Sequence, residues 1–333
     1  MKFLKKIVFI PILGLVLAGC NPGTTTVAAA VANERVAKAM GQTTMSSTVN
    51  TMSMSIGAEL DLVQELYQND AKVSSTSIEA SGNLDLKATD LSGDDLEASL
   101  TASASLVLQE TEGGQTSELF NETIGANVYL NDMWLYFHLT GIGDLMEMEE
   151  DELKAKVNVE GVFENIEVPV PTSTPNSEEL TEMTDMMETM LMEIDDVEAV
   201  ETNGNLVVTY TITVEDIVDV IVAATTYFES DMTASEIEAF RQEGLDAMND
   251  MIKINTAKIV VGVSSLGYLN RFDVDVDVEI TTDEFEIDET TTEYEVVKID
   301  ALIEFAMEIN GNVTVTPLTG LDEYIDMNPQ ETY

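Results

Sequence analysis

The sequence predicts an α+β fold, in which a large curved antiparallel sheet carries helices on its apolar face. Two long blocks, about 45–139 and 252–315, alternate apolar and polar residues with period two. Between them, residues 178–251 hold three segments of helical spacing and a two-residue turn signal, Asn203-Gly204. Strands, then helices, then strands again is an order typical of the α+β class.

The first block predicts an Ala-rich helix over 27–40, followed by five or more long strands in a meander. One face of such a meander is apolar and the other faces water. Five dipeptides mark the expected turns: Asn69-Asp70, Gly82-Asn83, Gly93-Asp94, Gly113-Gly114 and Asn131-Asp132.

The middle of the chain predicts a loop rich in proline and three capped helices. Pro169, Pro171 and Pro175 indicate the loop, and 178–194 follows it as a helix with a capping box. Thr213 and Thr233 begin two further helices, which end near Phe228 and Met251.

The second block predicts more strands and an acidic tail. The expected strands cover 259–263, 272–280, 292–297, 303–309 and 313–315. The tail from Pro317 is expected to be loosely held. No composition break divides the chain, so we expect a single domain over 27–316 and an acidic C-terminal tail over 317–333.

The charge excludes several classes of partner. The chain has 333 residues, of which 63 are Asp or Glu and 14 are Lys or Arg, so the formal net charge is −49. A surface this acidic repels phosphates, which excludes nucleic acid and adsorption to anionic lipid. The hydrophobic share of 44% is that of a globular protein rather than a disordered tail.

The N-terminus has the order of a lipoprotein signal. Three lysines precede an apolar run from Ile7 to Leu17, which is too short to span a bilayer. The run ends in Leu17-Ala18-Gly19-Cys20, which resembles the lipobox of bacterial lipoprotein precursors. The resemblance implies a signal peptide over 1–19, a lipidated Cys20 and a short tether over 20–26, on the extracytoplasmic face of a membrane. Two acyl chains make a stable anchor.

The order of elements resembles the LolA/LppX-like lipoprotein-carrier fold. A helix, a long meander, a helical insert and a returning meander follow the lipobox, and 127–134 is similar to a recurrent hairpin of such lipoproteins. The resemblance implies a half-open β-barrel whose concave face is covered by helices. It also implies that a lipid or acyl chain binds between sheet and helices.

Methionine is concentrated in the first insert helix, and a flexible, polarisable side chain suits a tolerant apolar cavity. The alternative is that these methionines fill an irregular core. The candidate cavity lining is Trp134, Met183, Met187, Met190, Leu191, Ile217, Ile221 and Val274.

Little in the chain points to catalysis. His138 is the single histidine and no nucleophile motif accompanies it, so we expect no enzyme, no cofactor and no metal site. Asp273, Asp275, Asp277 and Glu279 share one strand face about 6–7 Å apart, which suits a solvated face with weak divalent cations. We therefore expect a monomeric, non-enzymatic lipoprotein that binds a hydrophobic ligand. An acidic surface scaffold with a dry core is the second hypothesis, and a hydrolase is the third.

Overall fold

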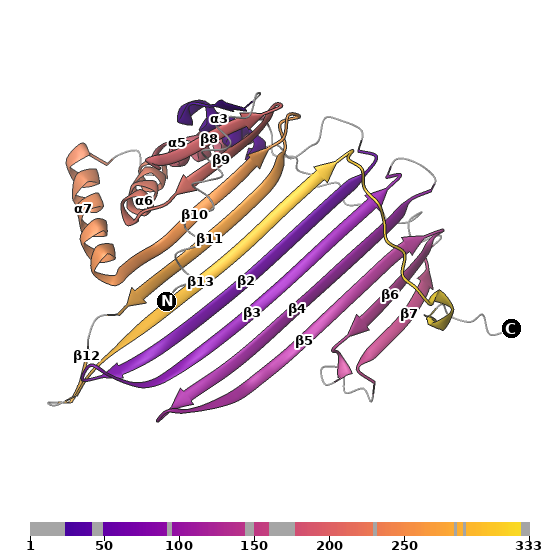
Figure 1. Cartoon of the computed structure of the whole chain (residues 1–333). Helices are drawn as coiled ribbons and strands as arrows, with labels where there is room; N and C mark the ends of the chain where they lie inside the picture. The colour runs from indigo at the N-terminus through magenta and orange to yellow at the C-terminus, as the bar shows by residue number, and fades with distance from the viewer. Residues whose placement is uncertain are drawn as a thin grey trace.

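The computed structural model describes residues 24–41, 49–91, 95–143, 150–159, 177–228, 232–282, 285–288 and 291–327. Within these ranges one 14-stranded sheet dominates the molecule (Figure 1). Its strands are β1 (Thr24–Thr26), β2 (Met52–Gln68), β3 (Ala71–Thr89), β4 (Glu97–Glu112), β5 (Gln115–Asn131), β6 (Trp134–Thr140), β7 (Glu152–Asn158), β8 (Asp196–Thr202), β9 (Asn205–Thr211), β10 (Ile252–Val263), β11 (Leu269–Thr281), β12 (Phe285–Asp288), β13 (Thr291–Ile309) and β14 (Ile325–Asp326).

The sheet is open, with β1 and β14 at its two ends. The order is β1-β8-β9-β10-β11-β13-β2-β3-β4-β5-β6-β7-β14, and β12 pairs with β13. Neighbours are antiparallel except β7 and β14. The long antiparallel strands and the helices expected from the sequence are therefore both present. The structure is mostly β, with both strand blocks in one sheet.

The first block forms the expected meander, β2 to β6, with one difference. Positive φ angles at Asn69, Asp70, Gly113 and Asp132 accompany the turns at three of the expected places, and the expected turn at Gly93-Asp94 lies outside the described residues. The expected turn at Gly82-Asn83 is wrong, because β3 runs straight through it. Gly82 pairs with Ala58 on one side and Ala104 on the other, so two ladders hold it extended.

The second block joins the first through β13, which lies between β11 and β2. We expected separate strands at 292–297 and 303–309, and instead one 19-residue strand covers both. Continuous pairing with β2, from Glu293 to Ile309, keeps the intervening residues extended. The expected strand at 313–315 is absent from the sheet, because Asn310 adopts a positive φ and the chain leaves the ladder there.

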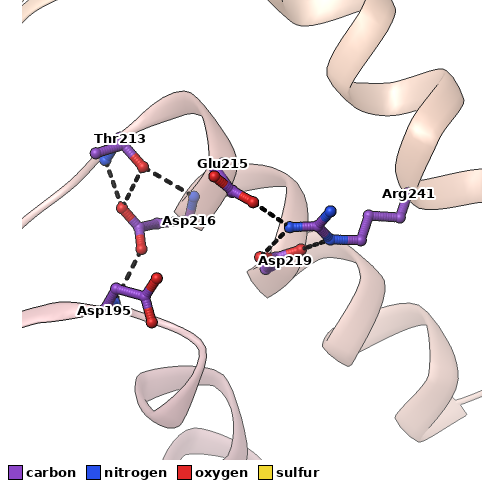
Figure 2. A network of polar contacts seen from close by, with 6 residues as sticks. All are labelled: Asp195, Thr213, Glu215, Asp216, Asp219 and Arg241. Atoms are coloured by element: carbon purple, nitrogen blue, oxygen red, sulfur yellow. Dashed lines mark hydrogen bonds and ion pairs between the residues drawn. The ribbon is translucent and has the colours of Figure 1, made fainter. Parts of the chain in front are cut away.

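Four helices occur in the described residues: α3 (Ala29–Gly41), α5 (Ser177–Met192), α6 (Val214–Phe228) and α7 (Ala234–Met251). The caps of the last two are those that the sequence predicts. The Asp216 carboxylate accepts from the Thr213 backbone N–H at 2.7 Å, and the Thr213 hydroxyl accepts from the Asp216 N–H at 3.2 Å (Figure 2). Thr233 and Glu236 form the reciprocal capping box of α7.

The helices cover only one end of the sheet, and their main contacts are with β8, β10 and β11 (Figure 1). There the buried Val36 of α3 belongs to one core cluster with Leu206 and Val208 of β9 and Val261 of β10. We expected helices over the apolar face as a whole, and this is wrong for the part of the sheet from β13 to β7. No described helix makes a major contact with those strands.

The described part of the C-terminal segment, up to residue 327, lies against the sheet. Leu321–Glu323 forms a 3-10 turn, and β14 then pairs with β7. Tyr324 is 5% exposed and meets the Tyr136 ring edge-on at 5.7 Å. We expected the segment after Pro317 to be loosely held, but this buried ring and the β14 pairing fix it to the sheet.

Candidate functional site

One face of the sheet is apolar across most of its width. Residues that pair across antiparallel strands share a face, and residues adjacent along a strand point to opposite faces. The pairings align two apolar rows across β13, β2, β3, β4 and β5: Ile303, Ala58, Gly82, Ala104 and Ile124; and Phe305, Ile56, Leu84, Ala102 and Ala126. We call the side that carries these rows the apolar face.

Much of this apolar face is open to solvent. The helices lie over the same side, but only at the β8–β11 end, where the core forms. Beyond that end, five large side chains of the apolar face are 36–43% exposed: Ile56, Leu106, Phe120, Ile124 and Ile303. A contiguous exposed apolar surface is uncommon on a soluble protein and marks an interaction site.

A hollow of about 420 Å³ lies on the apolar face at the edge of β4 and β5. Its lining is Ala104, Ser105, Leu106, Phe120, Glu122, Ile124 and Gly141. The small side chain of Ala104 leaves space that Leu106 and Phe120 border. The volume lies within the usual range of ligand pockets, roughly 300–1,000 Å³.

The end of β6 opens one side of this hollow. β6 pairs with residues 125–131 of β5, so the earlier half of β5 has no partner strand on that side among the described residues. Gly141 follows β6 with a φ of +69°. A Cβ atom there would lie 1.8 Å from the Thr123 carbonyl oxygen, so only glycine allows this close turn.

The opposite face is polar and strongly acidic. Asp277, Asp300 and Asp61 are aligned on it across β11, β13 and β2. Burial raises the pKa of Asp300, and the neighbouring carboxylates of Asp277 and Asp61 raise it further. Among the described residues, no group of three or more His, Cys, Asp or Glu side chains could hold a metal ion.

Two lysines converge on one carboxylate of this polar face. Lys72 and Lys298 lie 2.6 and 2.7 Å from the two Glu65 oxygens, and the Tyr67 hydroxyl donates to the same group at 3.1 Å. Burial acts to raise the pKa of Glu65, but these hydrogen bonds outweigh it and lower the pKa to about 2. The cluster ties β2 to β3 and β13.

His138 also lies on the polar face, where its Nε2 is 3.0 Å from Glu152 of the neighbouring strand. The geometry is that of a cross-strand polar pair.

The predicted cavity residues do not form one site. Trp134 lies on the polar face of β6, where the Lys156 ammonium sits 5.5 Å from its ring centre. Val274 lies on the apolar face of β11, next to the helical end. Trp134 therefore lies on the opposite side of the sheet from Val274 and from the helices.

The helical candidates gather at the β8–β11 end. Met187 and Met190 of α5 are half-buried, and Leu191 packs against the core; Met183 is in the same helix, but its side chain lies outside the described residues. On α6, which contacts α5, Ile217 is half-buried and Ile221 is 43% exposed. The hollow at β4 and β5 is lined by other described residues.

Sequence reasoning missed the exposed lining of the open face, Phe120 and Ile124. Alternation identifies which residues share a face, but not whether a helix covers that face. Cys20 and the rest of the signal segment lie outside the described residues. In the described part of the chain, no helix is both long and apolar enough to cross a membrane.

Comparisons with known proteins leave the family open. No protein-family model and no curated protein matches the chain. Among solved structures, the translocator domain of the autotransporter NalP from Neisseria meningitidis is similar over 78% of this chain and 89% of its own. The identity is 6% and the TM-score is 0.14, so this likeness carries no argument about fold or function.

Proposed function

We propose that this chain is a membrane-anchored, extracytoplasmic lipoprotein that binds a hydrophobic ligand, a lipid or an acyl chain, without catalysis. The observation that carries the proposal is the open apolar face with its hollow at β4 and β5. A ligand there would gain about 25 cal/mol for each Å² of apolar surface removed from water. The Leu106, Phe120 and Ile124 side chains, all more than 40% exposed, would lose their contact with water at the same time.

The proposed binding surface lies on the sheet rather than between sheet and helices. The main contacts of the helices extend as far as β11, and the hollow begins four strands further along the sheet, at β4. At about 4.8 Å per strand this is a distance of roughly 19 Å. In this proposal the helices close one end of a LolA/LppX-like half-barrel, and the remaining apolar face receives the acyl chain.

The proposed anchor explains how so acidic a protein stays at a membrane. The lipobox-like Leu17-Ala18-Gly19-Cys20 would supply the acyl chains, while the net charge of −49 would hold the folded part away from anionic head groups.

A second function is favoured by the acidic polar face, on which Asp277, Asp300 and Asp61 lie side by side. In that case the chain is a surface scaffold whose acidic exterior engages a partner, and the apolar face is covered by another protein rather than a lipid.

The test is lipid capture by the full chain carrying Cys20→Ser, which removes the site of lipid attachment. Native mass spectrometry should detect a copurified lipid, and the protein should take up a fluorescent acyl probe. Ile124→Asp should reduce uptake at least 10-fold. The matched control is Leu266→Asp, a 60% exposed leucine in the turn before β11, which should bind as the parent does.

A protein that is free of lipid and takes up no probe contradicts ligand binding and leaves the scaffold as the better explanation. The anchor is tested separately on the chain with Cys20 intact. Mass spectrometry of its N-terminal peptide should show a diacylglycerol on Cys20, and fractionation should place the protein in membranes.

A further inference from the structure

The hollow on the apolar face contains one acidic side chain, Glu122 of β5. Glu122 pairs across the sheet with Leu106, and Phe120 and Ile124 are its neighbours on the same face of β5. Its side chain is half-buried, and among the described residues it makes no hydrogen bond or ion pair. A carboxylate that is partly removed from water among apolar groups is costly unless a donor or a positive charge reaches it.

No other described residue of the hollow supplies that partner. The remaining lining residues are Ala104, Ser105, Leu106, Phe120, Ile124 and Gly141, and none of them is basic. The lysines of the described strands lie on the polar face, away from the hollow. Lys72 and Lys298 bind Glu65, and Lys154 binds Glu152 and Glu323. The others are Lys87, Lys156, Lys253 and Lys258, which are aligned with polar-face residues of the neighbouring strands. None of the described residues therefore supplies a counter-charge to Glu122, which leaves its carboxylate available to a cationic ligand.

The net charge of the whole chain also favours a positively charged ligand. A net charge of −49 creates a field that attracts cations and repels anions within the screening length of about 8 Å at physiological salt. A fatty-acid carboxylate that entered the hollow would bring its negative charge next to Glu122. An ammonium head group would instead form a charge-assisted hydrogen bond with it.

We propose that the hollow selects amphiphiles with a positively charged amine head group, which Glu122 binds while the acyl or alkyl chain lies along Leu106, Phe120 and Ile124. The inference rests on the proposed function, because it assumes that the apolar face receives a hydrophobic chain. It adds the head-group class and the residue that recognises it. An amphiphile of this kind satisfies both the apolar lining and the unpartnered carboxylate.

The experiment compares two probes of equal chain length and opposite head-group charge, dodecylammonium and dodecanoate. The full chain with Cys20→Ser is titrated with each by calorimetry below the micelle concentration. We expect dodecylammonium to bind at least 10-fold more tightly, since a charge-assisted hydrogen bond is favourable and the like-charge pair is not. Butylammonium, which has the head group without the chain, should bind at least 10-fold more weakly than dodecylammonium.

The variant Glu122→Gln keeps the shape of the side chain and removes its charge. It should lower dodecylammonium affinity about 5- to 10-fold and raise that of dodecanoate. The control Glu118→Gln changes the same charge on the same strand, but Glu118 pairs with Gln109 on the polar face and is exposed. It should leave both affinities unchanged, which separates recognition in the hollow from the general field of the chain.

The possible outcomes distinguish the proposed head-group selection from the proposed binding of a hydrophobic chain. Equal binding of both dodecyl probes, or an equal loss in Glu118→Gln and Glu122→Gln, overturns the head-group selection and leaves chain binding standing. Binding of butylammonium as tight as that of dodecylammonium shows surface attraction alone and also overturns the selection. Binding of neither dodecyl probe overturns the proposed function together with the inference.

Discussion

The Tyr210 hydroxyl donates a 3.0 Å hydrogen bond to the Asn33 side-chain oxygen, 177 residues earlier in the chain. Both residues are almost fully buried, and burial raises the pKa of Tyr210 well above its usual value. The Asn33 amide then donates to the Leu191 carbonyl at 2.8 Å. Strand β9, helix α3 and helix α5 are thus joined through one asparagine.

Tyr210→Phe should destabilise the helical end of the sheet. The change leaves the Asn33 oxygen buried without a donor, so the free energy of unfolding should fall by about 1–3 kcal/mol in urea titrations. In an Asn33→Leu background the same change should cost distinctly less, because the oxygen is already gone. Equal losses in both backgrounds would show that the hydrogen bond is not the source of the effect.

Acidification should remove a stabilising contribution of Glu65. Its folded pKa of about 2 lies below the ordinary 4.5, so the stabilisation is present above pH 4.5 and is lost as the pH falls toward 2. Relative to Glu65→Gln, the free energy of unfolding of the parent should fall by roughly 2 kcal/mol between pH 6 and pH 2. Solvent reaches the half-exposed lysines and keeps this loss smaller than the full pKa difference would give. The comparison is needed because acid also relieves repulsion among the other carboxylates. If the difference in free energy of unfolding between the parent and Glu65→Gln does not vary with pH, the charge of Glu65 does not stabilise the fold.

Arg241 should hold α7 against α6. Its guanidinium pairs with Asp219 and, at 2.5 Å, with Glu215, both on α6 (Figure 2). Arg241→Ala should speed hydrogen exchange of the α7 amides about 3- to 10-fold, because the ion pairs that join α7 to α6 are lost. Arg271→Ala, which removes an exposed arginine paired with Asp273 on β11, should leave α7 exchange unchanged. If hydrogen exchange of the α7 amides is unaltered in Arg241→Ala, the ion pairs of Arg241 do not hold α7 against α6.

Tyr324 should keep the C-terminal segment on the sheet. The ring is buried beside Tyr136, and the Met327 N–H donates to the Lys156 carbonyl at 2.9 Å. Tyr324→Ala should therefore make the segment around 317–327 accessible to limited proteolysis. Ile325→Ala, at a side chain 63% exposed, should resist cleavage as the parent does. The same cleavage rate in both variants would argue against Tyr324 as the anchor.

Local chemistry in the sequence was enough to predict most individual elements. The Asn203-Gly204 turn adopts positive φ at both residues, and Thr233 caps its helix, because these conformations depend on a few neighbouring atoms. Period-two alternation likewise predicted the polar and apolar sides of β11 and β2.

Features that depend on distant pairing could not be predicted in this way. Gly82 resembles a turn residue until two neighbouring strands hold it extended. Trp134 is predicted from the sequence to share one cavity lining with the helical methionines, although its register on β6 assigns it to the polar face. Phe120 and Ile124 escaped notice because exposure of an apolar face depends on where the helices lie.

The position of β13 affects the order in which the protein can fold. The strand lies between β11 and β2, and Lys298 meets Glu65 across 233 residues of chain. Until residues 291–309 have been synthesised, β2 has a partner on one side only, so its other edge can pair with a foreign strand. Contacts so far apart in sequence form slowly. The nascent chain therefore depends on protection against aggregation until its last long strand closes the gap.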